Sequence, residues 1–284
     1  MFRDPSKLAN KEYDLVVIGA GIYGACIAWD AALRGLSVAL VERGDFGQET
    51  SANSLKTVHG GLRYLQDFDF KLVRMMFEER STYLRIAPHL VQPLACITPT
   101  YNQIMKSKAV LGTALKLNDI AGYDRNKLLD VDREIPSSQL ISLETCQEVL
   151  PGLPDEGVTG AALWHDAQVY DTERLTLAFV ASAVNAGAEA SNYFKATGYL
   201  IQANQVQGIT ARDNITNDEY KIRSRVVINA TGPWIDRNLE YLNQKSTQPI
   251  FQPSLAINII TRRIVQDYAV GMPSWPGENN ADGS

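Results

Sequence analysis

The fold is decided by the stretch Tyr13-Asp14-Leu15-Val16-Val17-Ile18-Gly19-Ala20-Gly21-Ile22-Tyr23-Gly24. A short apolar, β-branched run leads directly into three glycines with the spacing GxGxxG, and helix-forming residues follow from Ala25 to Arg34. Gly35 supplies a helix stop, and Leu36 to Val41 alternates as a second strand that ends at Glu42. The sequence therefore predicts a βαβ unit.

The three glycines have the spacing of a dinucleotide-binding turn. Gly19 allows the tight turn, Gly21 lets the backbone approach a pyrophosphate without a Cβ in the way, and Gly24 lets the helix pack close to the strand. The free N–H groups of the helix then face the phosphates. Glu42 follows Gly24 by 18 residues and is placed to accept hydrogen bonds from ribose hydroxyls, which disfavours NADP. FAD and NAD both remain open at this point.

Bulk composition excludes several classes of function. The 284 residues are 45% hydrophobic, enough for one large domain or two interleaved ones. The net charge of -5 gives no basic field for nucleic acid. Cys26, Cys96 and Cys146 are too far apart in sequence for a CxxC pair or a zinc site, so we expect no metal and reduced cysteines. No apolar run reaches the ~20 residues of a membrane span, and no signal peptide is expected.

One apolar stretch that carries lysines leaves open whether the protein contacts a membrane surface. Residues 104–120 carry Lys106, Lys108 and Lys116 among apolar side chains. The pattern is typical of an ordinary amphipathic surface helix, and a peripheral contact with an anionic membrane surface is the alternative. We expect a cytoplasmic location, with peripheral contact at the inner face of the cytoplasmic membrane as that alternative.

Periodicity predicts several further elements. Residues 68–87 read as a helix with Phe70, Val73, Phe77 and Leu84 on its buried face. Three strands are expected at 199–203, 206–212 and 220–222, followed by a separate apolar strand from Arg225 that ends in Ala230-Thr231-Gly232-Pro233-Trp234. His89 and His165 are expected to be structural, and Trp234 to be a core or lid aromatic.

The run Thr50-Ser51-Ala52-Asn53-Ser54-Leu55-Lys56-Thr57-Val58-His59-Gly60-Gly61-Leu62-Arg63-Tyr64-Leu65 matches the pattern TSxxSxKxxHGGLRYL. It resembles the FAD-dependent glycerol-3-phosphate dehydrogenases, which are FAD oxidoreductases similar to D-amino-acid oxidase. Residues 160–175 and 230–234 resemble the same family's GALxxxDxxxDxxRL and ATGPW. The resemblance favours FAD over NAD, and it implies that the hydroxyls lie along the diphosphate and that His59 to Gly61 pass beside the flavin ring.

The resemblance and the glycine turn together imply a set of cofactor-binding residues: Gly19, Ala20, Gly21, Gly24, Glu42, Arg43, Thr50, Ser51, Ser54, His59, Gly60, Gly61, Leu62, Ala230, Thr231 and Gly232. Flat backbone at the paired glycines is expected to leave room for the flavin ring. Arg63 and Tyr64 would face the substrate. The alternative for these two is that they brace the flavin loop through a salt bridge and packing.

Asn258 marks a departure from the family. Relatives have a histidine there, a candidate for taking the substrate hydroxyl proton, whereas an amide can donate or accept a hydrogen bond but cannot hold that proton. Either the substrate differs or another group is the base, with Asn258 as a candidate catalytic position. Relatives also continue for about one more domain. We therefore expect a truncated chain with little activity alone, which Asn258→His would raise only if the remainder were supplied.

These observations predict an α/β protein with a Rossmann-like FAD-binding domain, an interleaved substrate domain built on an antiparallel sheet, and a missing carboxy-terminal part of the fold. The expected ranges are 1–87 and 170–235 for FAD binding, 88–169 and 236–271 for substrate, and 272–284 as a polar tail.

The predicted activity is oxidation of glycerol-3-phosphate, a small phosphorylated alcohol, to dihydroxyacetone phosphate, with electrons passed to quinone or another acceptor. The alternatives are a related FAD oxidoreductase for another amine, amino acid or hydroxy acid, or a flavin-binding fragment without turnover.

Overall fold

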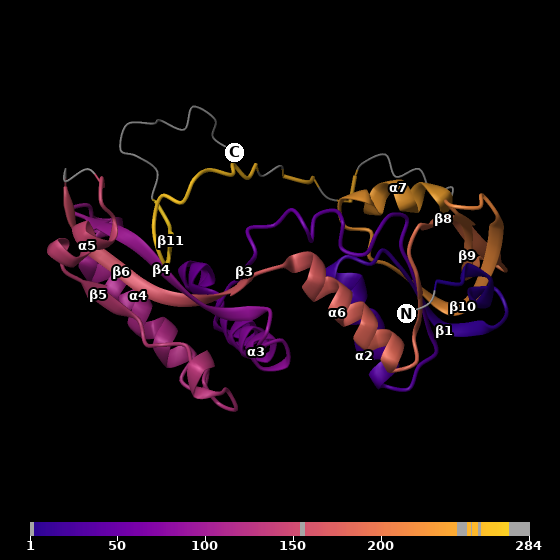
Figure 1. The fold of residues 1–284 in the computed structure, drawn as a ribbon, viewed down its shortest axis with the longest axis horizontal. Helices are drawn as coiled ribbons and strands as arrows, with labels where there is room; N and C mark the ends of the chain where they lie inside the picture. The colour runs from indigo at the N-terminus through magenta and orange to yellow at the C-terminus, as the bar shows by residue number, and fades with distance from the viewer. Residues whose placement is uncertain (1–2, 154–156, 243–248, 251, 255–256, 273–284) are drawn as a thin grey trace. The chain divides into compact units, whose positions relative to one another are not determined.

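The computed structural model describes residues 3–153, 157–242, 249–250, 252–254 and 257–272. Two compact units are formed (Figure 1): the first from Met1–Leu55 and Asp171–Asn258, the second from Lys56–Tyr170 and Ile259–Ser284. The expected domain ranges placed residues 56–87 with the FAD-binding part. In the structure they join the second unit, because β3 (Thr57–Val58) pairs with a strand of that unit. Of the expected tail at 272–284, residues 273–284 lie outside the described residues.

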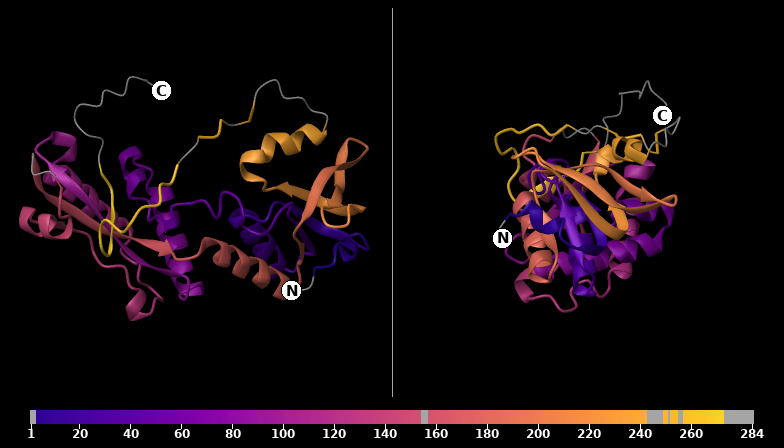
Figure 2. Two further views of the ribbon diagram at one scale, coloured as in Figure 1. Left: turned by 45° about the horizontal axis from the view of Figure 1, so that its top comes forward. Right: turned by 90° about the vertical axis from the view of Figure 1, so that its right-hand side faces the viewer.

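The first unit is built on a six-stranded mixed sheet. Four strands run parallel, and the last two are antiparallel (Figure 2). In sheet order they are β7 (Glu189–Ser191), β2 (Val38–Val41), β1 (Glu12–Ile18), β10 (Glu219–Asn229), β9 (Gln205–Asp213) and β8 (Phe194–Gln202). The predicted βαβ unit is therefore present, with β1 and β2 parallel and adjacent.

β10 corrects one expectation. The sequence predicted two strands, at 220–222 and from Arg225, but the structure has one continuous strand. Ile222 and Ser224 are buried while Arg223 and Arg225 are exposed, so the alternation of an extended strand continues through polar residues. The strand pairs with β9 over its first half and with β1 from Arg223 onward.

Two long helices cover the parallel part of this sheet. α2 (Ile22–Leu33) follows the glycine turn, and α6 (Thr172–Asn185) begins where the Asp171 carboxylate accepts a hydrogen bond from the N–H of Arg174 at 2.9 Å. The helices pack side by side, with the Trp29 and Phe179 rings edge to face at 5.1 Å. The shorter helices are α1 (Pro5–Leu8), η4 (Gly232–Trp234), α7 (Ile235–Leu239) and η5 (Glu240–Leu242).

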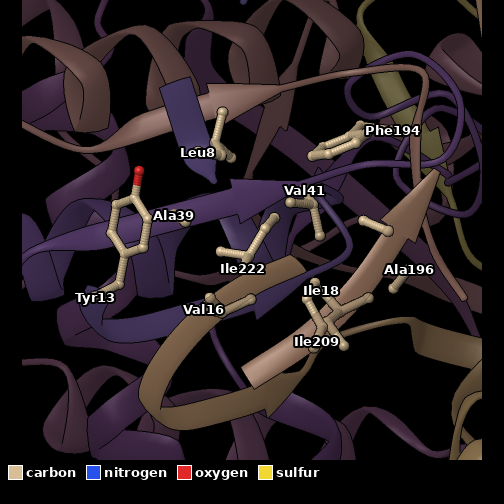
Figure 3. Close-up of a cluster of buried hydrophobic side chains, with 11 residues drawn as sticks. Leu8, Tyr13, Val16, Ile18, Ala39, Val41, Phe194, Ala196, Ile209 and Ile222 are labelled. Atoms are coloured by element: carbon tan, nitrogen blue, oxygen red, sulfur yellow. The ribbon is translucent and has the colours of Figure 1, made fainter. Parts of the chain in front are cut away.

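The core of the first unit joins its parallel and antiparallel strands (Figure 3). Val16 and Ile18 of β1 pack with Ile209 of β9 and Ile222 of β10, and all four are buried. This cluster therefore packs β1 against strands that come late in the sequence. Close packing of these strands fixes the position of the glycine turn that follows β1.

The second unit is built on a mostly antiparallel sheet, as expected for the interleaved domain. β4 (Val91–Tyr101) and β6 (Val158–Val169) form its long central pair. β3 and β5 (Gln139–Ile141) pair antiparallel with β6, whereas β11 (Tyr268–Val270) adds to β4 in parallel.

Three helices of the second unit pack on this sheet: α3 (Phe70–Ile86), α4 (Lys108–Ala121) and α5 (Leu143–Val149). The unit also contains the short helices η1 (Leu62–Asp67), η2 (Ile104–Lys106) and η3 (Val131–Arg133). Three of the four predicted stripe residues of α3 are buried, but Phe70 is 46% exposed. Phe70 is the first residue of the helix, and the cluster that buries Val73 and Phe77 lies further along it. No helix within the described ranges is both long and apolar enough to cross a bilayer.

Candidate functional site

The glycine turn after β1 is closed by backbone contacts that exclude side chains. Gly19 has φ +99°, and a Cβ there would lie 2.6 Å from the carbonyl oxygen of Ala230. A Cβ on Gly24 would lie 1.8 Å from the carbonyl oxygen of Gly19. The end of β1, the first turn of α2 and the residues after β10 therefore meet with no space for a methyl group. This is the geometry that the predicted roles of Gly19 and Gly24 need.

The start of α2 forms a cradle for an anion. Gly21 is the N-cap and has no side chain to occupy the helix end, while the Ser51 hydroxyl accepts a hydrogen bond from the N–H of Ile22 at 2.9 Å. The N–H groups of the first helical turn have no intrahelical acceptor and carry the positive end of the helix dipole. A Cβ on Gly21 would lie 3.0 Å from the Ser51 oxygen, so the missing side chain keeps this cradle open. The site fits a dinucleotide diphosphate.

Glu42 follows the last residue of β2, and its carboxylate binds both the glycine turn at Ala20 and the loop that begins at Gly44. Its Oε2 accepts a hydrogen bond from the N–H of Ala20, and its Oε1 accepts one from the N–H of Gly44, both at 2.8 Å. A carboxylate has about four acceptor positions. Glu42 therefore keeps capacity for the two hydroxyls of a ribose while it orients the glycine turn.

Beside Glu42, Arg43 stacks on an aromatic ring that the sequence did not connect to it. The Arg43 guanidinium carbon lies 4.1 Å from the centroid of the half-buried Trp234 ring, and Nη2 donates to Glu49 Oε1 at 2.9 Å. Trp234 is thus the platform for an arginine next to the expected adenosine position. The cue available in the sequence was weak, because the two residues are 191 positions apart.

The segment after β10 also contributes to this turn. Ala230 donates its N–H to Ile18 at 2.8 Å, and the Thr231 hydroxyl donates to Asn229 Oδ1 at 2.7 Å. Gly232 follows with φ +55°. Two predicted residues of the hydroxyl-rich run, Thr50 and Ser54, are exposed.

In the second unit, the His59-Gly60 segment is held by one buried carboxylate. Asp166 Oδ1 accepts the N–H of Gly60 at 2.7 Å, and Oδ2 lies 3.0 Å from Nδ1 of His59. The guanidinium of Arg80 donates through Nη1 to the same Oδ1 at 3.2 Å and to the carbonyl of His165 at 2.8 Å. Arg80 is 1% exposed.

Sequence reasoning missed both Asp166 and Arg80. Asp166 lies within residues 160–175, the stretch that resembles a family pattern with two aspartates, so a signal was present. Arg80 lies on the same helical face as Val73, Phe77 and Leu84, and an arginine on an apolar stripe is the cue that could have revealed it.

Burial and charge act against each other in this cluster. Burial opposes ionisation of Asp166, but the hydrogen bonds from His59 and Gly60 and the charge of Arg80 leave its pKa below the usual value. Burial lowers the pKa of Arg80 and of His165. The hydrogen bond to Asp166 raises the pKa of His59 despite partial burial. The cluster therefore contains an anion between a guanidinium and an imidazole.

The structure shows why position 60 is a glycine, and the reason differs from the expected one. We expected flat backbone here to leave room for a flavin ring, but a Cβ on Gly60 would lie 2.1 Å from Nη1 of Arg80. The glycine makes room for the protein's own buried arginine. Gly61 has φ +87°, a left-handed conformation that glycine adopts without strain.

The remaining predicted residues lie in different parts of the chain. Leu62 and Tyr64 pack against the buried cluster of Leu65, Val73 and Phe77. This packing is what the alternative for Tyr64, a residue that braces the loop, requires. Arg63 lies in η1, and its side chain is outside the described part of the structure. Asn258 is exposed in an irregular segment at the end of the first unit.

Comparison with known proteins places the chain among flavoproteins. The family "FAD dependent oxidoreductase" matches residues 14–283. The glycerol-3-phosphate dehydrogenase of Synechocystis sp. is 37% identical over 82% of this chain and 41% of its own length. The alpha-glycerophosphate oxidase of Lactococcus lactis is 34% identical over 90% of this chain and 41% of its own length. The chain thus spans about two fifths of the length of these curated relatives.

A solved structure shows the same likeness. The glycerol-3-phosphate dehydrogenase of Bacillus halodurans, in complex with FAD, aligns with a TM-score of 0.62 at 28% identity over 83% of this chain and 37% of that one. The predicted α/β fold class and FAD as the cofactor are confirmed. The chain belongs to the family of FAD-dependent oxidoreductases.

Proposed function

We propose that the protein oxidises glycerol-3-phosphate to dihydroxyacetone phosphate. The observation that carries the proposal is the identity of 34–37% to relatives named for glycerophosphate oxidation, over more than four fifths of this chain. The run from Thr50 to Leu65, which matches the pattern of that family, supports it. The chemistry that bound FAD would supply is acceptance of the hydride from the secondary carbinol carbon, and a base would take the hydroxyl proton.

The first unit is assigned to FAD binding. The N–H groups at the start of α2 would hold the diphosphate, with Ser51 fixing the helix end, and Glu42 would hold the ribose. Arg43, stacked on Trp234, would lie near the adenine. Thr50, Ser54, Ala230, Thr231 and Gly232 complete the proposed set in this unit.

The second unit is assigned to substrate. His59, Gly60, Gly61 and Leu62 would flank the flavin ring, and Arg63 would supply a cation for the substrate phosphate. Tyr64 would brace this segment through its packing on Leu65. Asn258, which ends the first unit, would orient the substrate hydroxyl by hydrogen bonding but could not take its proton.

Asn258 supports the alternative of another substrate. The same scaffold carries many chemistries, and an L-proline dehydrogenase of P. horikoshii shares this fold with a TM-score of 0.66 at 21% identity. An amine, amino acid or other hydroxy acid is therefore the competing substrate class, and flavin binding without turnover is the third proposal.

Substrate identity is tested by anaerobic reduction of the bound flavin. Glycerol-3-phosphate added to the FAD-loaded protein is expected to bleach the flavin absorption band, and glycerol, which lacks the phosphate, is expected to leave it. The bleaching is expected to be slow, ~10²–10⁴-fold below the rate of a family member that has its general base, because Asn258 cannot hold the substrate proton. Bleaching by an amino acid or amine instead would replace the proposal with the alternative, and no bleaching by either would favour flavin binding alone.

A second prediction concerns the anion cradle. Gly21→Val is expected to abolish retention of FAD while the protein stays folded, because the branched side chain fills the space between Ser51 and the helix start. Flavin absorbance after gel filtration measures occupancy, and circular dichroism measures the fold. Full occupancy in the variant would show that the diphosphate does not lie at this helix end.

Quinone as the electron acceptor and a cytoplasmic site with peripheral membrane contact are further proposals. The second rests on α4 and the η2 turn before it, where Ile104, Leu117 and Ile120 are exposed among Lys106, Lys108 and Lys116. Such a surface suits the boundary of an anionic membrane.

A further inference from the structure

Asp166 contacts two successive residues of the segment that matches HGGLRYL. Its side chain is 8% exposed, and each carboxylate oxygen has its own task. Oδ1 accepts the backbone N–H of Gly60 at 2.7 Å, and Oδ2 meets Nδ1 of His59 at 3.0 Å. One side chain of β6 therefore fixes both the path of the backbone and the orientation of the imidazole ring.

Arg80 forms a buried ion pair with the Asp166 carboxylate. Its Nη1 lies 3.2 Å from Oδ1 of Asp166, and the guanidinium stacks 4.8 Å from the Phe77 ring centroid. Gly60 leaves room for this guanidinium, because a Cβ there would lie 2.1 Å from Nη1 of Arg80. A carboxylate held in this way keeps its geometry when the exposed ring beside it meets a ligand.

The ring itself is available to a ligand. The His59 side chain is 60% exposed, although its partner is buried. Because Nδ1 points at the carboxylate, Nε2 lies on the far side of the ring. A carboxylate can only accept a hydrogen bond, so the proton between them belongs to Nδ1 of His59.

We propose that Asp166, held by Arg80, is a positioning residue that fixes His59 as the Nδ1–H form and leaves Nε2 as the nitrogen offered to the bound flavin. This deepens the proposed function, because it rests on the assignment of the His59 segment to the flavin ring. Neither Asp166 nor Arg80 needs to touch the ligand.

The surrounding charges are consistent with this role. On β4, burial raises the pKa of the Cys96 thiol to about 12, so it stays neutral. On β6, burial and the nearby Arg80 and Arg125 lower the pKa of His165, which disfavours a second imidazolium. Within the described ranges, the charge that acts on His59 is thus that of Asp166, which Arg80 contacts in turn. The Asp166 hydrogen bond raises the pKa of His59, and removal of the carboxylate should lower it.

The test is an NMR titration of the imidazole signals, which is tractable because the chain has three histidines. His59→Gln identifies the His59 signal by its disappearance. In the unmodified protein, ring nitrogen shifts above the pKa of His59 are expected to show Nδ1 protonated. Asp166→Asn should lower the pKa of His59. Asp124→Asn is the matched control, because it removes a carboxylate of the same unit that pairs with Arg74.

FAD affinity provides the second measurement. Asp166→Asn and His59→Gln are each expected to raise the Kd for FAD roughly tenfold, the effect of about one hydrogen bond, and Asp124→Asn to leave it unchanged. A proton on Nε2 in the unmodified protein would overturn the proposal without any variant. So would an unchanged His59 pKa in Asp166→Asn, or an FAD Kd that stays at the unmodified value. Neither measurement depends on glycerol-3-phosphate, so failure of the proposed substrate is a separate result.

Discussion

Arg80→Met is expected to lower the free energy of unfolding by about 3–5 kcal/mol at neutral pH, the usual cost of removing one partner from a buried ion pair. Methionine can occupy much of the volume of the arginine stem, so the loss comes mainly from charge. Asp166 would remain buried as an anion, and its remaining hydrogen-bond partners among the described residues would be the His59 ring and the Gly60 N–H. Urea denaturation of the purified variant measures the loss.

The pH dependence separates charge from packing. Burial and hydrogen bonding leave the pKa of Asp166 lowered in the unmodified protein, so its contribution to stability is present above its unfolded-state pKa and disappears as the pH falls through the folded one. The difference between Arg80→Met and the unmodified protein should therefore shrink in acid. A difference that stays constant with pH would mean that packing, and not the ion pair, accounts for the loss.

Two further variants serve as controls for Arg80. Arg85→Met makes the same change at an exposed position of the same helix and should have little effect. The double variant Arg80→Met/Asp166→Asn removes both charges and should recover much of the lost stability, since an uncompensated buried charge no longer remains. If the double variant were as unstable as the sum of the two single ones, the two residues would not be coupled.

Gly24→Ala is expected to destabilise the first unit by about 3 kcal/mol or more, at the upper end of the cost of overpacking. The new methyl group would lie 1.8 Å from the carbonyl oxygen of Gly19 and 3.5 Å from the Ala230 side chain. Backbone of β1 or α2 would have to move, and the helix start would move with it. We therefore expect loss of bound FAD as well as a lower urea midpoint.

Gly35→Ala is the matched control for this glycine. Gly35 has φ +80°, and nothing lies within 4 Å of the position that a Cβ would take, so only the left-handed conformation is penalised, by about 1 kcal/mol. FAD occupancy should be unchanged. Equal effects of the two substitutions on FAD would show that close helix packing at Gly24 is not what holds the cradle.

The sequence predicted the parts of the fold that depend on local pattern. An apolar run, three spaced glycines and a second apolar run lie within 30 residues of one another, from Tyr13 to Glu42, and the structure has β1, α2 and β2 there. The same holds for the hairpin of β8 and β9, whose turn at Asn204 was marked by polar residues. The continuity of β10 was hidden because Arg223 and Ser224 lower its apolar content.

The candidate site was predicted less completely, because its contacts connect distant positions. Arg80 and Asp166 are 86 residues apart, and no periodicity links a helix face to a strand of another segment. The same limit applies to Arg43 and Trp234. The sequence singled out Gly60 for a place beside the flavin ring, but it could not show that an arginine from a later helix occupies the space of the missing side chain.

The pairing of β1 with β10 has a consequence for synthesis on the ribosome. Glu12 is in register with Arg223 and Ile18 with Asn229, so one edge of β1 stays without its neighbour until more than 200 further residues have been translated. The β4–β6 pair needs only residues 91–169 and can form earlier. An apolar strand with an open edge is a template for aggregation in the meantime. The nascent first unit is thus the part of this polypeptide that would benefit most from a chaperone.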